Sequence, residues 1–234
     1  MQTKHYIIEN IAEFSEHTEA VKKLKEYLDC IDEVAFPIIE EIFGQVWDYD
    51  QINIKLDDST GSASYRVEGN YHIVKMGIYN RNIQREYPKN LWGCLFHETH
   101  HAFLNPIIHN KRDGKIFNGG HKAEVFNYAF MATSYLKLKE KNKIDVQVYE
   151  HFLKKLEREL DKCNREFRVS DKYEYERELP DNTMDIFQEY IHLFSMNIEN
   201  FSKFISYLKS SDSVFTNVSN FRQDLDKAKE FLAN

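Results

Sequence analysis

The sequence predicts an α+β fold, and three features of its 234 residues lead to this prediction. Apolar residues recur at helical spacing in the first 43 residues, short β-rich runs separated by turn residues follow, and helical periodicity returns and continues to the end. With 42% hydrophobic residues, the chain can bury a substantial core. We expect residues 1–234 to form a single domain. Its N-terminal lobe, about residues 1–105, would hold helices and a small antiparallel sheet, and its C-terminal lobe, about 106–234, would be mainly α-helical.

The N-terminal segment from Ile7 to about Phe43 has the periodicity of an amphipathic helix. Pro37 should interrupt this helix, and Gly44 should end it. We therefore expect one long helix or two shorter ones, whose apolar side includes Ile11, Phe14, Val21, Leu24, Leu28 and Ile31.

The segment between Gln51 and Tyr79 has the pattern of short strands. Three β-rich runs, "INIKL", "ASYRV" and "YHIVKMGIY", are separated by "DDSTGS" and "EGN". Both separators are rich in residues that form turns. A small antiparallel sheet is the expected product.

Helical patterns dominate the rest of the chain. A helix is expected after Pro88, with the stretch "LFHETHHAFL" inside it and an end at Asn105-Pro106. A loop rich in turn residues follows, and then a second apolar helix, "HKAEVFNYAFMATSYLKL". Further helices are expected past Lys143 and, after a polar tyrosine-rich break, up to Leu232.

Composition and charge argue against several kinds of partner. The formal charge is −7, and lysines are mixed with glutamates along the chain, so a nucleic acid is not expected to bind. Neither a signal peptide nor an apolar stretch of membrane-spanning length is recognisable, which predicts a cytoplasmic protein that does not enter the membrane. Three widely spaced cysteines, Cys30, Cys94 and Cys163, are expected to be buried thiols. The oligomeric state stays open.

The stretch His97-Glu98-Thr99-His100-His101 contains the H-E-x-x-H pattern of metal-dependent hydrolases. On a helix, His97 and His101 project from one face, so both imidazoles can reach one Zn²⁺ ion at about 2.0–2.1 Å. Glu98 is turned by roughly 100° from His97, which leaves its carboxylate beside the metal and able to accept a proton. The spacing predicts metal-assisted hydrolysis with Zn²⁺ as cofactor.

A zinc site of this kind needs a third protein ligand. A third histidine six residues after the second, preceded by a glycine, is excluded because Leu104 and Ile107 occupy those positions. Glu124, 23 residues after His101, lies in the next apolar helix, where a carboxylate without a partner would be costly. It is the expected third ligand.

The stretches "HETHH" and "GGHKAEVFNYAF" together resemble the gluzincin metallopeptidases, the group that includes thermolysin and the zinc aminopeptidases. The resemblance covers about residues 50–135. It implies a zincin-like fold, with His97, His101 and Glu124 as metal ligands and Glu98 as the general base. It also implies that the strand before the motif helix, about Tyr71–Ile78, forms the cleft edge that pairs with an extended substrate.

The resulting functional prediction is a zinc-dependent metallopeptidase that hydrolyses peptide bonds in peptides or exposed protein segments. A metal-bound water would attack, with Glu98 taking its proton and passing it to the leaving amine. The absence of a "G-x-M-E-N" segment favours an endopeptidase or an enzyme with a narrow, dedicated substrate. Candidates for the donor that stabilises the oxyanion are His109, His121, Tyr128 and Tyr190.

Two other interpretations stay open. The chain could be a non-catalytic, peptidase-like scaffold that binds metal and a protein partner, although such a scaffold would not need Glu98. It could also be a structural helical protein in which the motif arose by chance. For His100, contact with the ligands or surface exposure is expected rather than metal binding. Asn127 and Tyr128 could contact a ligand or simply pack, and Trp92 and Phe96 are expected in the core.

Overall fold

The computed structural model describes residues 1–48, 50–61, 63–80, 94–109, 121–169, 189, 198–210, 226–227, 229–231 and 233. The chain divides into two compact units, Met1–Phe103 and Leu104–Asn234. Sheet and helices combine in the first unit, while the elements assigned in the second are helices. The predicted mixture of a small sheet with several helices is therefore confirmed.

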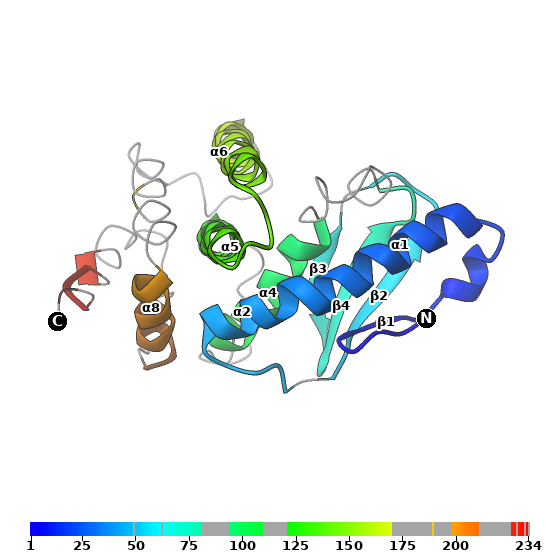
Figure 1. Cartoon of the computed structure of the whole chain (residues 1–234), viewed down its shortest axis with the longest axis horizontal. Helices are drawn as coiled ribbons and strands as arrows, with labels where there is room; N and C mark the ends of the chain where they lie inside the picture. The colour runs from blue at the N-terminus through cyan, green and yellow to red at the C-terminus, as the bar shows by residue number, and fades with distance from the viewer. Residues whose placement is uncertain are drawn as a thin grey trace. The chain divides into compact units, whose positions relative to one another are not determined.

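The first unit contains a four-stranded sheet with the strand order β1-β2-β4-β3 (Figure 1). Three of its strands coincide with the three predicted β-rich runs. The prediction of an antiparallel sheet was wrong, since β1–β2 and β2–β4 are parallel and only β3–β4 is antiparallel. The strands are β1 (Tyr6–Ile8), β2 (Ile52–Asp57), β3 (Ser64–Glu68) and β4 (Tyr71–Gly77).

Turn length explains which strands run antiparallel. Only two residues join β3 to β4, and Gly69 at the first of these positions has a φ of 62°, as a tight hairpin requires. The connection from β1 to β2 instead contains helices, which allow the chain to return to the same end of the sheet and start a parallel strand.

The first strand, β1, was expected to be helical and is not. Tyr6 and Ile8 are buried, and the strand pairs with β2 in the register Tyr6↔Ile52. β-branched isoleucines favour this extended conformation, and the backbone bonds to β2 replace those of a helix.

Helices cover one face of the sheet. Ile52, Ile54 and Leu56 of β2 are buried on this face, whereas Lys55 points to the other, more polar face. Figure 1 shows α1 and α2 lying across the sheet as one nearly continuous rod. The helical elements are η1 (Ile11–Phe14), α1 (Thr18–Cys30), the π-helical turn η2 (Ile31–Ala35) and α2 (Phe36–Phe43).

The interruption expected around Pro37 is the π turn that separates α1 from α2. Pro37 lies in the first turn of α2, directly after the wider π turn, where the missing N–H of a proline costs little. The predicted end at Gly44 is confirmed, because Gly44 has a φ of 65° in a left-handed cap.

A buried polar pair joins the N-terminal segment to the π turn. His5 Nδ1 lies 2.6 Å from Asp32 Oδ1, and the two side chains are 6% and 7% exposed. The His5 ring also stacks on Phe36 with a centroid separation of 3.6 Å. Burial alone would raise the pKa of Asp32, but hydrogen bonds from His5 and Thr3 outweigh it and hold the pKa below its usual value.

We expect Asp32→Ala to lower the free energy of unfolding by about 3 kcal/mol at pH 7, because His5 would lose its buried partner. Since the pKa of Asp32 is lowered by folding, its stabilising contribution is present above the pKa of the unfolded chain. This contribution disappears as the pH falls through the lower, folded value. Urea titrations of both proteins at pH 7 and at acidic pH should show the difference between them shrinking, and a difference independent of pH would contradict this assignment.

Helix α4 (Cys94–His109) carries the motif and begins in the first unit. Its predicted end at Asn105-Pro106 was wrong, because the helix continues to His109. A proline removes only its own N–H bond and crowds one carbonyl in the preceding turn, so a helix can pass through it at a cost of about 3 kcal/mol.

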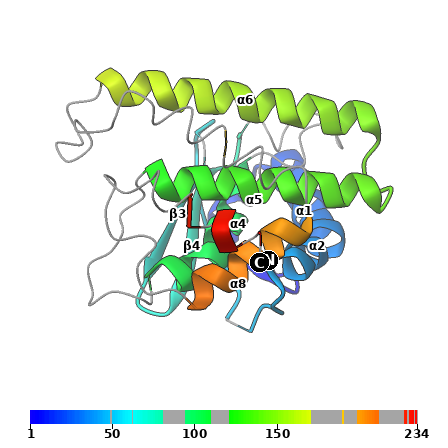
Figure 2. The ribbon, with the colours of Figure 1, turned by 90° about the vertical axis from the view of Figure 1, so that its left-hand side faces the viewer.

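The second unit contains α5 (His121–Glu140), α6 (Val146–Val169) and α8 (Ile198–Ser210). The helix predicted from "HKAEVFNYAFMATSYLKL" is α5 and is confirmed. Figure 2 shows α5 and α6 side by side, and Tyr135 stacks on Phe152 between them at 4.5 Å. Phe130 of α5 stacks on Phe201 of α8 at 5.0 Å. In the part of the chain that the structure describes, none of the helices combines the length and the apolar character needed to cross a membrane.

Candidate metal centre

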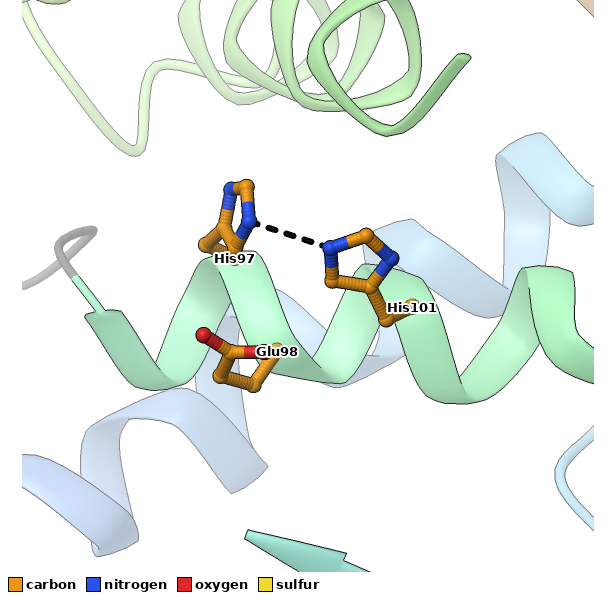
Figure 3. A group of neighbouring side chains, drawn as sticks. All are labelled: His97, Glu98 and His101. Atoms are coloured by element: carbon orange, nitrogen blue, oxygen red, sulfur yellow. Dashed lines mark hydrogen bonds between the residues drawn. The ribbon is translucent and has the colours of Figure 1, made fainter. Parts of the chain in front are cut away.

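The two motif histidines point to the same side of α4 (Figure 3). Their Nε2 atoms are 3.1 Å apart, and both side chains are partly exposed. Glu98 leaves the helix on a different side and is 6% exposed. One ligand atom from each of His97, Glu98 and His101 lies within 4.8 Å of the others.

The separation of the two nitrogens suits a shared metal ion. Two nitrogens bound tetrahedrally at zinc–ligand distances would be about 3.3 Å apart, close to the 3.1 Å found here between His97 and His101. Imidazole nitrogens are also common ligands of zinc in proteins. The donor set therefore fits Zn²⁺, and the geometry is one that the four-residue spacing on a helix produces.

The burial pattern of α4 separates the motif histidines from the core. Leu95, Phe96, Ala102 and Phe103 are buried, which confirms the core position predicted for Phe96. His97 and His101 lie outside this buried set, on a stripe that remains reachable from solvent. These two histidines are therefore not part of the buried core.

His100, in contrast, belongs to the core. It is fully buried, which excludes surface exposure, one of the two alternatives expected for it, and its Nδ1 donates a hydrogen bond of 2.6 Å to the Phe96 carbonyl. Burial lowers the pKa of His100 to about 3, so the ring is neutral at pH 7. This hydrogen bond to the backbone of its own helix explains how His100 is tolerated in the core of the first unit.

The motif helix is held against the sheet by a buried chain of hydroxyl groups. The Tyr6 hydroxyl of β1 lies 2.6 Å from Thr99 Oγ1, and Thr99 in turn donates to the Leu95 carbonyl at 2.7 Å. Burial raises the pKa of Tyr6, which keeps the phenol protonated and available as a donor. Since Thr99 lies between His97 and His101, this contact sets the rotation of the helix that presents both histidines.

An aromatic side chain from the sheet lies beside His101 and is linked to further ring side chains. The Tyr65 ring lies 6.2 Å from the His101 ring and is nearly parallel to it, and the Tyr65 hydroxyl is 2.6 Å from His72 Nδ1. Trp47 packs edge-on against His72 at 5.0 Å. Sequence reasoning missed these neighbours. The alternation along "ASYRV" and "YHIVK" was the available signal, since it places Tyr65 and His72 on one face once the two strands are paired.

The other predicted site residues belong to the second unit or lie outside the described part of the chain. Glu124 belongs to α5, but its side chain lies outside the described part, so its role as third ligand stays a prediction. Among the candidate oxyanion donors, Tyr128 is buried in the second unit. The side chains of His109 and His121 and the whole of Tyr190 lie outside the described residues, as does Trp92. Asn127 is fully buried in α5.

The prediction that about Tyr71–Ile78 forms the cleft edge that pairs with the substrate was wrong. The segment Tyr71–Ile78 contains β4, which lies between β2 and β3 and hydrogen-bonds to both of them. A strand paired on both sides has no backbone groups left for a substrate. Among the strands that the structure describes, β1 and β3 lie at the edges of the sheet.

Comparison with known proteins does not assign the chain to a group: no protein-family model, no curated protein and no solved structure matches it. The functional interpretation therefore rests on the chemistry and geometry of its own residues.

Proposed function

We propose that this protein is a zinc-dependent metallopeptidase of the gluzincin type, with a zincin-like fold, that hydrolyses peptide bonds in the cytoplasm. The observation that carries the proposal is the His97–His101 pair, with its two Nε2 atoms 3.1 Å apart and the Glu98 carboxylate nearby. A partly exposed pair of this geometry can accept an ion and admit a substrate.

In this proposal His97 and His101 hold the zinc ion, and Glu124 completes the set of protein ligands. When bound, zinc would act as a Lewis acid on the substrate carbonyl and lower the pKa of a water molecule. Nothing beyond the three side chains is required of the protein to hold the ion.

Glu98 is the proposed general base. Its carboxylate accepts the proton of the attacking water and delivers it to the nitrogen of the leaving amine. Two features support this role: Glu98 follows a ligand directly on the helix, and its side chain leaves α4 on a different side from the histidines. Glu98 therefore lies near His97 and His101, the two ligands that face each other, without being one of them.

Strand β3 is the proposed site for the substrate backbone. Among the described strands it lies at an edge of the sheet, and four of its five residues are exposed, with Val67 at 40%. An extended peptide could add to this edge through backbone hydrogen bonds. The proposed substrate is accordingly an unfolded peptide or an exposed, extended protein segment, cleaved as by an endopeptidase.

Metal content tests the proposal directly. We expect inductively coupled plasma mass spectrometry of the tag-free protein to find about one zinc per chain, and His101→Ala to lose it. His151→Ala provides a matched control, because His151 is an exposed histidine on α6. A wild-type protein that holds no metal even after incubation with zinc would overturn the proposal.

A further inference from the structure

A hydrogen-bonded pair of side chains from the sheet adjoins the candidate ligand His101. Tyr65 of β3 and His72 of β4 lie diagonally across the β3–β4 hairpin, on the face that α4 covers. The phenol oxygen is 2.6 Å from His72 Nδ1. Strands that neighbour each other thus supply a rigid link between two polar aromatic groups.

Tyr65 differs from the rest of its strand in burial. The other four residues of β3 are exposed, whereas Tyr65 is partly buried. Its ring is within 10° of parallel to the imidazole of His101, with 6.2 Å between the centroids. An edge strand that is otherwise solvated therefore directs one flat side chain alongside the ligand histidine.

His72 is in turn held in place by the core. It is 5% exposed and packs edge-on against Trp47, whose ring contacts Phe103 at 4.9 Å. Burial lowers the pKa of His72 to about 4, so its ring is neutral at pH 7 and can keep Nδ1 as an acceptor for the Tyr65 hydroxyl. The hydrogen bond consequently ties Tyr65 to a side chain that has little freedom to move.

We propose that Tyr65 is a positioning residue for the metal centre: held by His72, its ring restricts the orientation of the His101 imidazole and keeps Nε2 directed at the ion. This inference rests on the proposed function, because it assigns His101 as a metal ligand. Side chains that orient a ligand histidine preserve metal affinity, since the ring does not have to be ordered when the ion binds.

The test measures zinc affinity by competition with a chromophoric chelator, and the ligand geometry by the visible spectrum of the Co²⁺-loaded protein. We expect Tyr65→Leu, which removes the ring, to weaken zinc binding by about 10-fold or more and to change the cobalt spectrum. Tyr71→Leu serves as the matched control, because Tyr71 is 55% exposed and lies on the opposite face of β4. It should bind zinc as the wild type does.

Two further variants separate orientation from general destabilisation. Tyr65→Phe and His72→Phe both keep an aromatic ring. The first variant removes the hydroxyl group of the hydrogen bond, and the second removes its Nδ1 partner. Both should weaken zinc binding by a similar, smaller factor than Tyr65→Leu. The double variant should be no weaker than either single one, because the same bond is lost in all three. If Tyr65→Leu does not fold, zinc binding by these variants still tests the proposal.

The outcomes distinguish this inference from the proposed function. Zinc binding in the wild type combined with unchanged affinity and cobalt spectrum in folded Tyr65 variants overturns the positioning role alone. Additive losses in the double variant would likewise contradict it. A wild-type protein without zinc overturns both proposals.

Discussion

Replacement of Glu98 by glutamine should leave the zinc content unchanged and reduce peptide hydrolysis by about 10²–10⁴-fold, the usual contribution of a general base. An amide has nearly the shape of the carboxylate but cannot take a proton at neutral pH. The measurement is kcat/KM on peptides selected from a library by the wild-type enzyme, together with the metal content of each protein.

Glu150→Gln is the matched control for this experiment, since Glu150 is an exposed glutamate on α6. It should retain wild-type turnover. If Glu98→Gln hydrolyses peptides as fast as the wild type, Glu98 is not the base. If the wild type binds zinc but cleaves no peptide in the library, the non-catalytic scaffold becomes the better interpretation.

Zinc should also stabilise the fold strongly, because the folded chain brings together ligands that the unfolded chain keeps apart. With free zinc at about 1,000 times its dissociation constant, the stabilisation is about 4 kcal/mol. For a protein of this size, that corresponds to a rise in Tm of about 8–16 °C. Differential scanning calorimetry with zinc and with a chelator measures this difference, and His97→Ala should abolish it.

The control for His97→Ala is again His151→Ala, which should respond to zinc as the wild type does. An equal effect of zinc on the wild type and on His97→Ala would show that the ion binds elsewhere. No effect on the wild type would support the interpretation of the motif as a chance pattern.

Local patterns in the sequence predicted most of the elements. The runs that form β2, β3 and β4 were recognisable from their β-rich composition and from the turns between them. The apolar periodicity likewise predicted α5 and the rod that contains α1 and α2. These signals are visible within windows of about ten residues, so they do not depend on the tertiary structure.

Strand β1 and the parallel pairings could not be predicted in the same way. β1 has only three residues, and its conformation depends on pairing with a strand that follows more than forty residues later. The buried alternation of β2 is equally compatible with parallel and antiparallel neighbours. The connections between the strands determine strand direction, and the residue pattern within a strand carries no information about those connections.

The candidate site likewise has one part that local sequence patterns predict and another part that depends on the tertiary structure. The relation between His97, Glu98 and His101 follows from helix geometry alone, and the structure places them as that geometry requires. The proximity of Tyr65 to His101, and of His72 to Tyr65, instead depends on the register of the β3–β4 hairpin and on the packing of α4 against it. Helical periodicity could not indicate which strand residue would lie beside His101.

The contact between Tyr6 and Thr99 has a consequence for how the protein folds. It joins residues 93 positions apart in the chain. The parallel pairing of β1 with β2 is also non-local, whereas α5 and α6 are joined by a short connection. Because closing long loops is entropically costly, non-local contacts slow folding. When the full chain refolds, we therefore expect the α5–α6 hairpin to form before the helix that carries the histidines docks onto the sheet.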